Sequence, residues 1–413
     1  MKTSLKFLAI FLAVGAVAHA QVEPAATGPG GPGVQPAGPN LQYSLRFSQA
    51  AEFGGYIGNW QTSTASGQLD YLNGNERFPF TMDYTGGYTW TISGPDYLGG
   101  VFQNLWISQG MGGRKWRFRA SDDLGYRPSA PYTGLSGVAG IGEPIGGPSP
   151  APPSTETILT LKTHTLDNSG IVNLDLDLNF ATTLTLSGTS NVLYYPNGDG
   201  LNTDGELASS QLTRRLNARS SLSGEYLYAY YTYPDYDFSL DTNTGLFGYN
   251  RNWTKKLSTT LSVGPEWVSS SDSAVAPSAT RIAANAAINY KSRSETASVS
   301  YRRATSSGAG YLEGADLNWV AGNLERNFGP KLKIGLTGTY SRTTGLVNNG
   351  NVNTRLGGAQ ITRRVAGHFS LFANYTVSNQ SASVALPTNT LNNTLQMMSF
   401  GIGYSPRETR LTQ

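Results

Sequence analysis

The chain has 413 residues, with 30 Lys and Arg, 27 Asp and Glu and a formal net charge of +3. It contains no cysteine, which excludes a disulfide framework, a thiolate metal site and an acylated cysteine anchor. Without Lys2 and Lys6, which belong to a processed segment, 28 basic residues stand against 27 acidic ones, so the charge indicates no nucleic-acid partner. The 49 Gly, 23 Tyr and 15 Phe residues are typical of an all-β protein.

The first 20 residues read as a cleavable signal peptide. Lys2 and Lys6 form a basic start, residues 7–17 form an apolar run, and Ala18-His19-Ala20 is a small-x-small cleavage site. The apolar run is too short to span a membrane as a helix, so we expect export and a mature chain that begins at Gln21. Residues 21–40 hold five Pro and five Gly and are expected to form a flexible or extended leader.

Residues 41–405 are expected to form alternating β-strands joined by turns. Short polar turns can be placed near residues 73–77, 111–114, 181–183, 217–220, 254–256, 291–294, 329–331 and 366–368. Eight such turns join 16 strands. A strand from about Leu41 to Ala50 and another from about Thr394 to Tyr404 raise the count to 18, whereas 16 holds if the first two candidate strands do not join the sheet.

Residues 128–155 hold seven Pro and six Gly, a composition that fits either an interdomain linker or a long loop. The distance between the second and third turns is near 70 residues, which equals one ordinary 37-residue unit with about 30 residues added at its far end. Turn counting therefore favours a single enlarged outer loop.

An apolar or aromatic residue followed by a tight turn recurs about every 37 residues from Phe180 onwards, which predicts a repeated long β-hairpin. Within each hairpin, apolar residues such as Leu261 and Val263 alternate with polar residues such as Ser262. Stretches of this kind last about 10 residues or more, which is the length that a tilted strand needs to cross a membrane. We therefore predict a transmembrane antiparallel up-and-down β-barrel of about 16–18 strands, wide enough to hold an aqueous channel.

These features together resemble Gram-negative outer-membrane β-barrels of the porin-like type. The resemblance implies short turns on the periplasmic side, long loops outside, an aromatic girdle at each interface, and contact with outer-membrane lipid and the barrel-assembly machinery. The aromatic residues that fit a girdle are Trp253, Trp267, Tyr340, Tyr375 and Tyr404. One departure is that such barrels commonly end on an aromatic residue, whereas residues 406–413 continue here as a tail.

Two sets of charged residues are candidates for function. The repeated Arg214, Arg251, Arg326 and Arg363 share the parity of apolar neighbours and are expected to be anchors at the periplasmic interface. Other charged residues have the opposite parity and are expected to face the lumen: Asp175, Asp177, Glu225, Arg302 and Lys333. Because both signs are present, a pore lined by them would select weakly between ions.

Catalysis and cofactor binding have weaker support. His164 and His368 are the two histidines of the mature chain, and neither belongs to a recognisable nucleophile motif. Residues 197–205 look like a calcium loop but lack the ligand spacing of an EF-hand, and residues 140–147 resemble a phosphate loop without the helix that one requires. We expect no enzyme activity and no cofactor.

The sequence thus favours a porin-like outer-membrane channel for passive passage of small hydrophilic solutes, with an oligomer allowed. The alternative is a barrel without an open channel, with a structural role or an adhesive role carried by its loops. A soluble propeller fits less well, because each repeat holds two long alternations instead of about four short strands.

Overall fold

The computed structural model describes residues 40–54, 59–73, 75, 77–94, 99–127, 158, 164–198, 200–272, 276–308, 310–347, 349–383, 392–406 and 409–410. In these residues the chain is all β. The strands are β1 (Asn40–Gly54), β2 (Trp60–Asn73), β3 (Phe80–Ser93), β4 (Gly100–Gly112), β5 (Trp116–Arg127), β6 (Thr165–Asn179), β7 (Thr182–Tyr194), β8 (Thr203–Arg215), β9 (Ser220–Tyr233), β10 (Phe238–Asn252), β11 (Leu257–Ser270), β12 (Ala279–Lys291), β13 (Glu295–Ser306), β14 (Ala315–Phe328), β15 (Leu332–Gly345), β16 (Asn351–Ala366), β17 (Phe369–Ala382), β18 (Thr394–Tyr404) and β19 (Thr409–Arg410). None of the described residues belongs to a helix long and apolar enough to cross a membrane.

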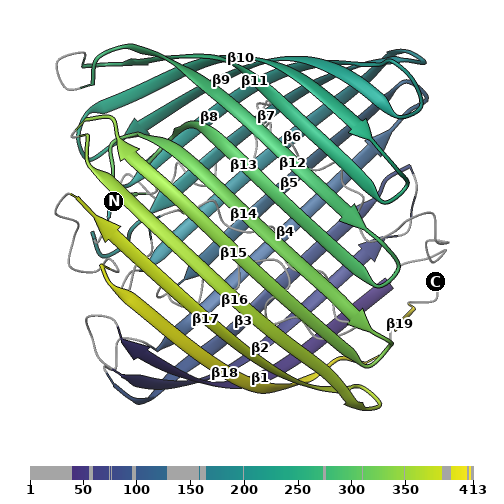
Figure 1. Ribbon diagram of the computed structural model, residues 1–413, viewed down its shortest axis with the longest axis vertical. Helices are drawn as coiled ribbons and strands as arrows, with labels where there is room; N and C mark the ends of the chain where they lie inside the picture. The colour runs from purple at the N-terminus through teal and green to yellow at the C-terminus, as the bar shows by residue number, and fades with distance from the viewer. Residues whose placement is uncertain are drawn as a thin grey trace, which may run out of the picture.

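The long strands β1 to β18 close into one antiparallel barrel. Each strand pairs with the next along the chain, and β18 returns to pair with β1 from Leu45 opposite Tyr404 to Gly54 opposite Leu395. Figure 1 shows the strands crossing the wall at a marked slant, as barrel closure demands. The predicted fold class is confirmed with the higher strand count, because the first two candidate strands also belong to the wall.

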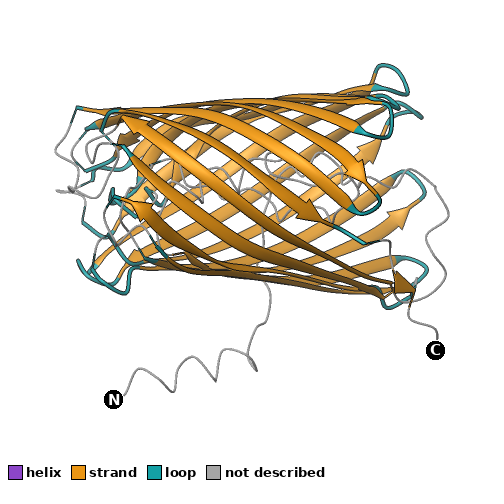
Figure 2. Cartoon of the chain, turned by 90° about the horizontal axis from the view of Figure 1, so that it is seen from below, coloured by secondary structure: helices purple, strands orange, loops and turns teal. Residues whose placement is uncertain are grey.

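The two ends of the barrel differ in their connections. Eight short turns, of which residues 329–331 are one, join β2 to β3, β4 to β5 and so on to β16 and β17 at the end we call the turn end. The other connections lie at the opposite end, which we call the loop end (Figure 2). β1 starts and β18 finishes at the turn end, where the two-residue β19 also pairs with Asn40 and Leu41. Thr409 and Arg410 therefore extend the pairing along β1 beyond the end of β18.

Side-chain hydrogen bonds explain why the short turns form where they do. The Asn75 side-chain oxygen accepts the amides of Arg77 and Phe78, and Asn217 accepts the amide of Arg219 in the same way. The Thr254 hydroxyl oxygen accepts the amides of Lys256 and Leu257. Asn and Thr that bond to a backbone two or three residues on mimic part of a turn, so these sequence positions bend the chain locally.

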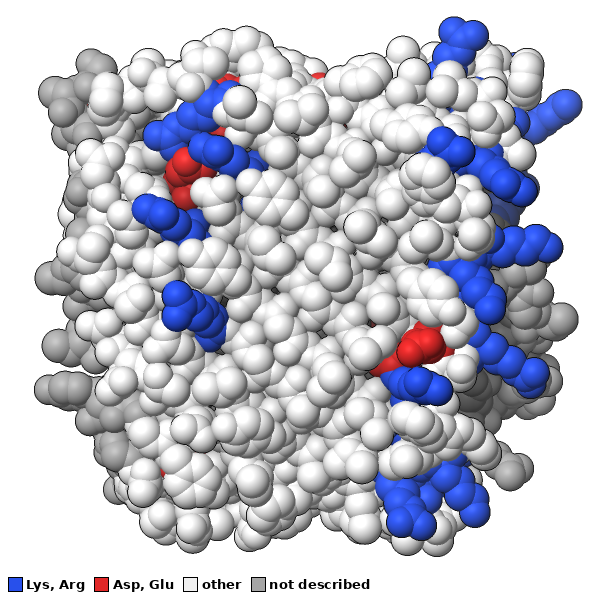
Figure 3. Space-filling model, viewed as in Figure 1, with Lys and Arg blue, Asp and Glu red and all other residues white. Residues whose placement is uncertain are grey.

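The outer wall is apolar and the inner wall is polar, which is the reverse of a water-soluble barrel. On β11, Val263 is 53% exposed and points outward, whereas Glu266 is 3% exposed and points inward. Figure 3 shows the consequence on the visible face, where a broad band without charged side chains lies between charged groups at the two ends. Such a band is the surface that a membrane-spanning barrel presents to hydrocarbon.

The connection between β5 and β6 contains the predicted long loop. These strands pair directly from Trp116 opposite Leu176 to Arg127 opposite Thr165, so residues 128–164 join neighbouring strands at the loop end. Residues 128–155 lie outside the described part of the chain, as do the predicted signal peptide 1–20 and most of the predicted leader 21–40. Asn40, the last residue of that leader, already belongs to β1.

A close approach of backbones between β10 and β11 yields a stability prediction. Pro265 has no amide hydrogen, and the pairs between these strands skip Gly245 and Leu246. A Cβ added at Gly264 would overlap the Gly245 carbonyl oxygen. We expect Gly264→Ala to lower the free energy of unfolding by about 1–3 kcal/mol, measured by urea titration in lipid vesicles. Gly322→Ala is the matched control, because its Cβ would meet Ser298 and Val299 only at ordinary contact distances of 3.7 and 3.8 Å. Equal losses in the two variants would contradict this reading.

Candidate channel interior

The sequence-predicted interior acids Asp175 and Asp177 lie on the inner row of β6, near the turn end. Arg117 of β5 lies 3.5 Å from the Asp175 carboxylate and 3.8 Å from that of Asp177. Thr185 and Thr183 of β7 donate hydroxyl hydrogen bonds of 2.8 and 2.9 Å to the same two carboxylates. The acids are therefore part of a cross-strand network with a cation that the sequence pattern did not single out.

The other three predicted interior residues lie on three different strands. Glu225 on β9 is nearly buried and accepts a hydrogen bond of 3.2 Å from the side-chain nitrogen of Gln211. Lys333 on β15 is nearly buried, and its Nζ lies 3.0 Å from the Glu325 carboxylate. Arg302 on β13 stands opposite Asn285 on the inner row of β12. The structure thus brings together only Asp175 and Asp177 of the five.

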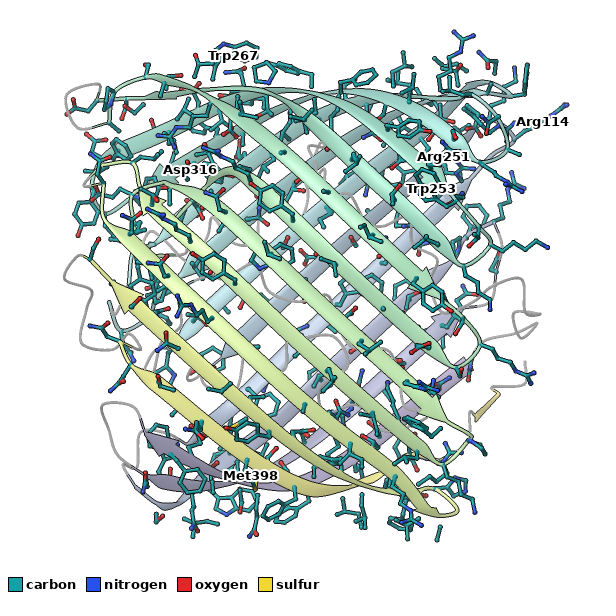
Figure 4. All side chains as sticks on the ribbon, viewed as in Figure 1. Arg114, Arg251, Trp253, Trp267, Asp316 and Met398 are labelled. Carbon is teal, nitrogen blue, oxygen red and sulfur yellow. The ribbon has the colours of Figure 1, made fainter. Side chains whose placement is uncertain are left out.

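The four predicted interface arginines all lie on outward rows at the turn end. The guanidinium of Arg251 stacks 4.1 Å above the Trp253 ring, and that of Arg326 lies 5.0 Å above the Phe328 ring. Arg326 also lies 3.9 Å from the Glu295 carboxylate on β13. In Figure 4 the labels Arg251 and Trp253 lie together at the turn end. Arg214 and Arg363 occupy the corresponding places, opposite Leu222 and Leu371 respectively.

The connection between β13 and β14 folds inward across the loop end. The Tyr233 hydroxyl, at the end of β9, donates a hydrogen bond of 2.8 Å to the carbonyl oxygen of Ser307. The amide of Leu201, between β7 and β8, donates one of 2.7 Å to the Gly310 carbonyl oxygen. Since β8 to β12 separate β7 from β13 in the wall, the connection over residues 307–314 reaches across part of the barrel mouth.

Two apolar clusters stabilise the inward position of the β13–β14 connection. Their buried members come from strand ends and from connections: Leu207, Ala229, Tyr231, Tyr233, Phe238, Leu240, Val268, Ala276 and Leu346 in the first, and Ile158, Tyr195, Tyr311, Leu312, Ala315 and Val352 in the second. The Tyr195 and Tyr311 rings meet edge to face at 5.7 Å. Gly314 has a φ of +76°, and a Cβ there would lie 2.8 Å from Leu240, so glycine allows the turn inward. Ile158 comes from the β5–β6 connection, so this residue packs against side chains from the opposite side of the mouth.

Glu266 ties the end of β13 to β11 over the intervening β12. Its buried carboxylate accepts the Thr305 amide at 3.1 and 3.2 Å and the Thr305 hydroxyl at 2.8 Å. The pairing of β12 with β13 ends at Ala284 opposite Arg303, two residues before Thr305. The carboxylate therefore takes the role of a strand partner for the Thr305 amide, and it holds this end of β13 inward.

The residues weighed for catalysis or metal binding have local structural contacts. The His164 ring lies 3.2 Å from the Tyr126 hydroxyl, and the His368 ring packs against Tyr404 in a turn. In the calcium-like stretch, Asn202 accepts the Tyr195 amide through its side-chain oxygen, whereas Asp199 lies outside the described residues. The described part of the chain contains no group of three or more His, Asp or Glu side chains placed to hold a metal ion.

Sequence parity could find inner-row charges, but it could not find their partners. Arg117, Arg281, Glu266 and Glu325 also have inner-row parity and were not singled out. The signal that would have found Glu325 and Glu266 is the same alternation that identified Lys333 and Arg302. No sequence signal links Arg117 with Asp175, because the pairing of β5 with β6 spans a connection of 37 residues.

Comparison with protein-family models finds no match, and comparison with curated protein sequences finds none either. Several solved structures are similar in fold. OccK2 (OpdF) of Pseudomonas aeruginosa is 11% identical over 90% of this chain and 98% of its own, with a TM-score of 0.45. The same protein in complex with glucuronate is 12% identical over 89% of this chain and 98% of its own, with a TM-score of 0.45. OccAB4 of Acinetobacter baumannii is 10% identical over 90% of this chain and 98% of its own, with a TM-score of 0.47. These similarities transfer no residue and no substrate to this chain.

Proposed function

We propose that this protein is an outer-membrane, porin-like channel for passive passage of small hydrophilic solutes. The observation that carries the proposal is a closed barrel of 18 long strands, among the described residues, with an apolar outer wall and a polar inner wall. A cylinder of this strand number is too wide for its own inward side chains to fill. A wall of that kind suits water inside and hydrocarbon outside.

The interior charges suit a pore of low ion selectivity. Arg117 offsets one of the two charges of Asp175 and Asp177, and Glu325 offsets Lys333, so these two cations and three carboxylates leave a small net negative charge. The inward connection over residues 307–314 is the candidate for the size limit. Arg214, Arg251, Arg326 and Arg363 act in this proposal as interface anchors that reach lipid phosphates at the turn end.

Reconstitution in planar bilayers tests the channel. The purified, heat-modifiable barrel should give stepwise conductance increases, and vesicles that contain it should admit small sugars but exclude large dextrans. A folded barrel that gives no conductance steps would contradict the proposal and favour the structural or adhesive alternative. Delivery to the outer membrane by the barrel-assembly machinery is checked by fractionating cells after depletion of that machinery.

Removing Arg117 should change the ion preference. In Arg117→Gln the carboxylates of Asp175 and Asp177 lose the cation that lies between 3.5 and 3.8 Å away. The cation-to-anion permeability ratio should then rise roughly twofold, measured as a shift of the reversal potential in a salt gradient. Arg114→Gln removes the same charge from the turn between β4 and β5 and should leave the ratio unchanged. A shift of equal size in both variants would mean that the interior pair does not set selectivity.

A further inference from the structure

The outward face of β13 to β16 carries a patch of arginines at the loop end, and this patch is separate from the turn-end arginines. Arg303, Asn318, Arg342 and Asn353 stand side by side in one cross-strand row. Arg355 lies in the next row, beside Tyr340. Neighbouring strands are about 4.8 Å apart, so the Cα atoms of Arg303 and Arg342 are separated by roughly 10 Å.

The patch is short of negative charge. Asp316 is shared, since its carboxylate lies 3.4 Å from Arg303 and 3.8 Å from Arg281. Buried atoms of these two arginines, Nε of Arg303 and Nη1 of Arg281, have no hydrogen-bond partner within the described part of the chain. Among the described residues, Arg342 donates to the side-chain oxygen of Asn351, a neutral acceptor, at 3.3 Å.

The Glu266 carboxylate does not neutralise the remaining positive charge of the patch. Glu266 stands opposite Arg281 on the inner side, but its oxygens accept hydrogen bonds from Thr305. On the outer wall, the three guanidinium groups of Arg303, Arg342 and Arg355 face one carboxylate, that of Asp316. A net positive charge of two therefore remains at the edge of the apolar band.

The position of the patch decides the kind of ligand. Val320 and Tyr340, one row deeper than Arg303 and Arg342, are exposed outward and begin the apolar band. Figure 3 shows basic side chains gathered around an acidic one at the loop end, at the place that Figure 4 labels Asp316. A ligand at this place contacts both arginine side chains and the apolar side chains that face hydrocarbon. It must therefore have an anionic part and an apolar part.

Elsewhere on the loop-end outer wall, the described strand residues include no basic side chain. Among the described outward positions in that half of the barrel, arginine occurs only on β13, β15 and β16, whereas Asp204, Glu206 and Asp241 gather on β8 and β10. Aromatic residues such as Trp267 occupy other places at the same level. The arginines are thus concentrated on one sector of the wall.

We propose that this sector binds the phosphate groups of a lipid headgroup in the leaflet at the loop end. Arginine is suited to phosphate because its planar fork donates two parallel hydrogen bonds. The spacing of roughly 10 Å between Arg303 and Arg342 fits a headgroup with two phosphates, one held at Arg303 and the other between Arg342 and Arg355. The acyl chains of the lipid then lie over the apolar band below.

Lipid binding in nanodiscs of neutral phosphatidylcholine tests the site, with a diphosphorylated glycolipid as the probe and native mass spectrometry as the readout. The triple variant Arg303→Gln, Arg342→Gln, Arg355→Gln should bind the probe roughly 100-fold more weakly, at about five-fold per arginine. The control variant Arg114→Gln, Arg219→Gln, Lys255→Gln removes three cations from short turns and should bind within about twofold of the unmodified barrel. The dephosphorylated glycolipid should not distinguish the unmodified barrel from the first variant.

Three results would overturn the proposal. The first is an unchanged affinity of the triple arginine variant for the probe, and the second is an equal loss of affinity in the control variant. The third is binding of the dephosphorylated glycolipid as tightly as the probe. If the heat-modifiability assay shows that the triple variant does not fold, the single variant Arg342→Gln is used instead. Its affinity for the probe should fall by about five-fold. Channel conductance measured in parallel separates this site from the proposed function, since the patch lies on the outer wall.

Discussion

Replacing Val263 by Lys should destabilise the barrel by about 2–4 kcal/mol, whereas replacing its neighbour Ser262 by Lys should have little effect. Val263 lies at the middle of β11, with Phe247 and Ala284 opposite it on the outward rows of β10 and β12. A charge there meets hydrocarbon far from either interface. Ser262 points inward between Gly248 and Asn285, where water can hydrate the new ammonium group. Urea unfolding of the two variants in lipid vesicles measures the difference.

The two substitutions form a matched pair, because they add the same side chain to adjacent positions of one strand. Valine has a higher strand propensity than serine, but the whole propensity scale spans only about 1 kcal/mol. A difference of about 2 kcal/mol or more, on the order expected for a charge in hydrocarbon, therefore reports the environments of the two faces. Ser262 does lose one hydrogen bond, a contact of 3.3 Å from the Asn285 side-chain nitrogen. Equal destabilisation by both, or greater destabilisation by Ser262→Lys, would contradict a hydrocarbon-facing outer wall.

Shortening the inward connection should open the channel. Ser306 and Ala315 are already paired across β13 and β14, so residues 307–314 can be replaced by Asn-Gly, which closes a two-residue hairpin. This change removes Tyr311 and Leu312 from the apolar cluster that lies across the mouth. The single-channel conductance should rise by roughly twofold or more, because the narrowest cross-section governs ion flow.

Two controls accompany the shortened variant. Glu266→Gln keeps the connection but weakens the hydrogen bonds to Thr305, so an intermediate gain with more frequent conductance fluctuations is expected. Only the shortened variant should admit large dextrans into the vesicles. Unchanged conductance in a folded shortened barrel would show that another segment sets the narrowest section.

The alternation that appears in single strands is a local property, and this explains why the wall could be predicted so fully. Neighbouring residues point to opposite faces, so Val263 and Ser262 can be assigned without knowing which strands they pair with. The turns are equally local, since Asn75, Asn217 and Thr254 bond to backbone amides within three residues. Each of the eight expected turns coincides with or overlaps a connection between two consecutive strands.

The interior contacts depend on pairs that lie far apart in the chain. Glu266 binds Thr305, 39 residues away, and Tyr233 binds Ser307, 74 residues away. Nothing in the composition of residues 307–314 distinguishes an inward fold from an outward loop, because glycine and polar residues suit both. The same holds for the arginine patch, since Arg303 and Arg342 become neighbours only when their strands assemble side by side.

The sequence by itself determined the transmembrane barrel, the two faces of each strand and the positions of the short turns, because each of these follows from residues within one strand or one turn. Only the tertiary structure decided the count of 18 strands in the described chain, the pairing of β19 with β1, the inward connection and the partners of Asp175 and Lys333. These features arise from closure of the sheet, which sets distant residues side by side without leaving a periodic trace in the sequence.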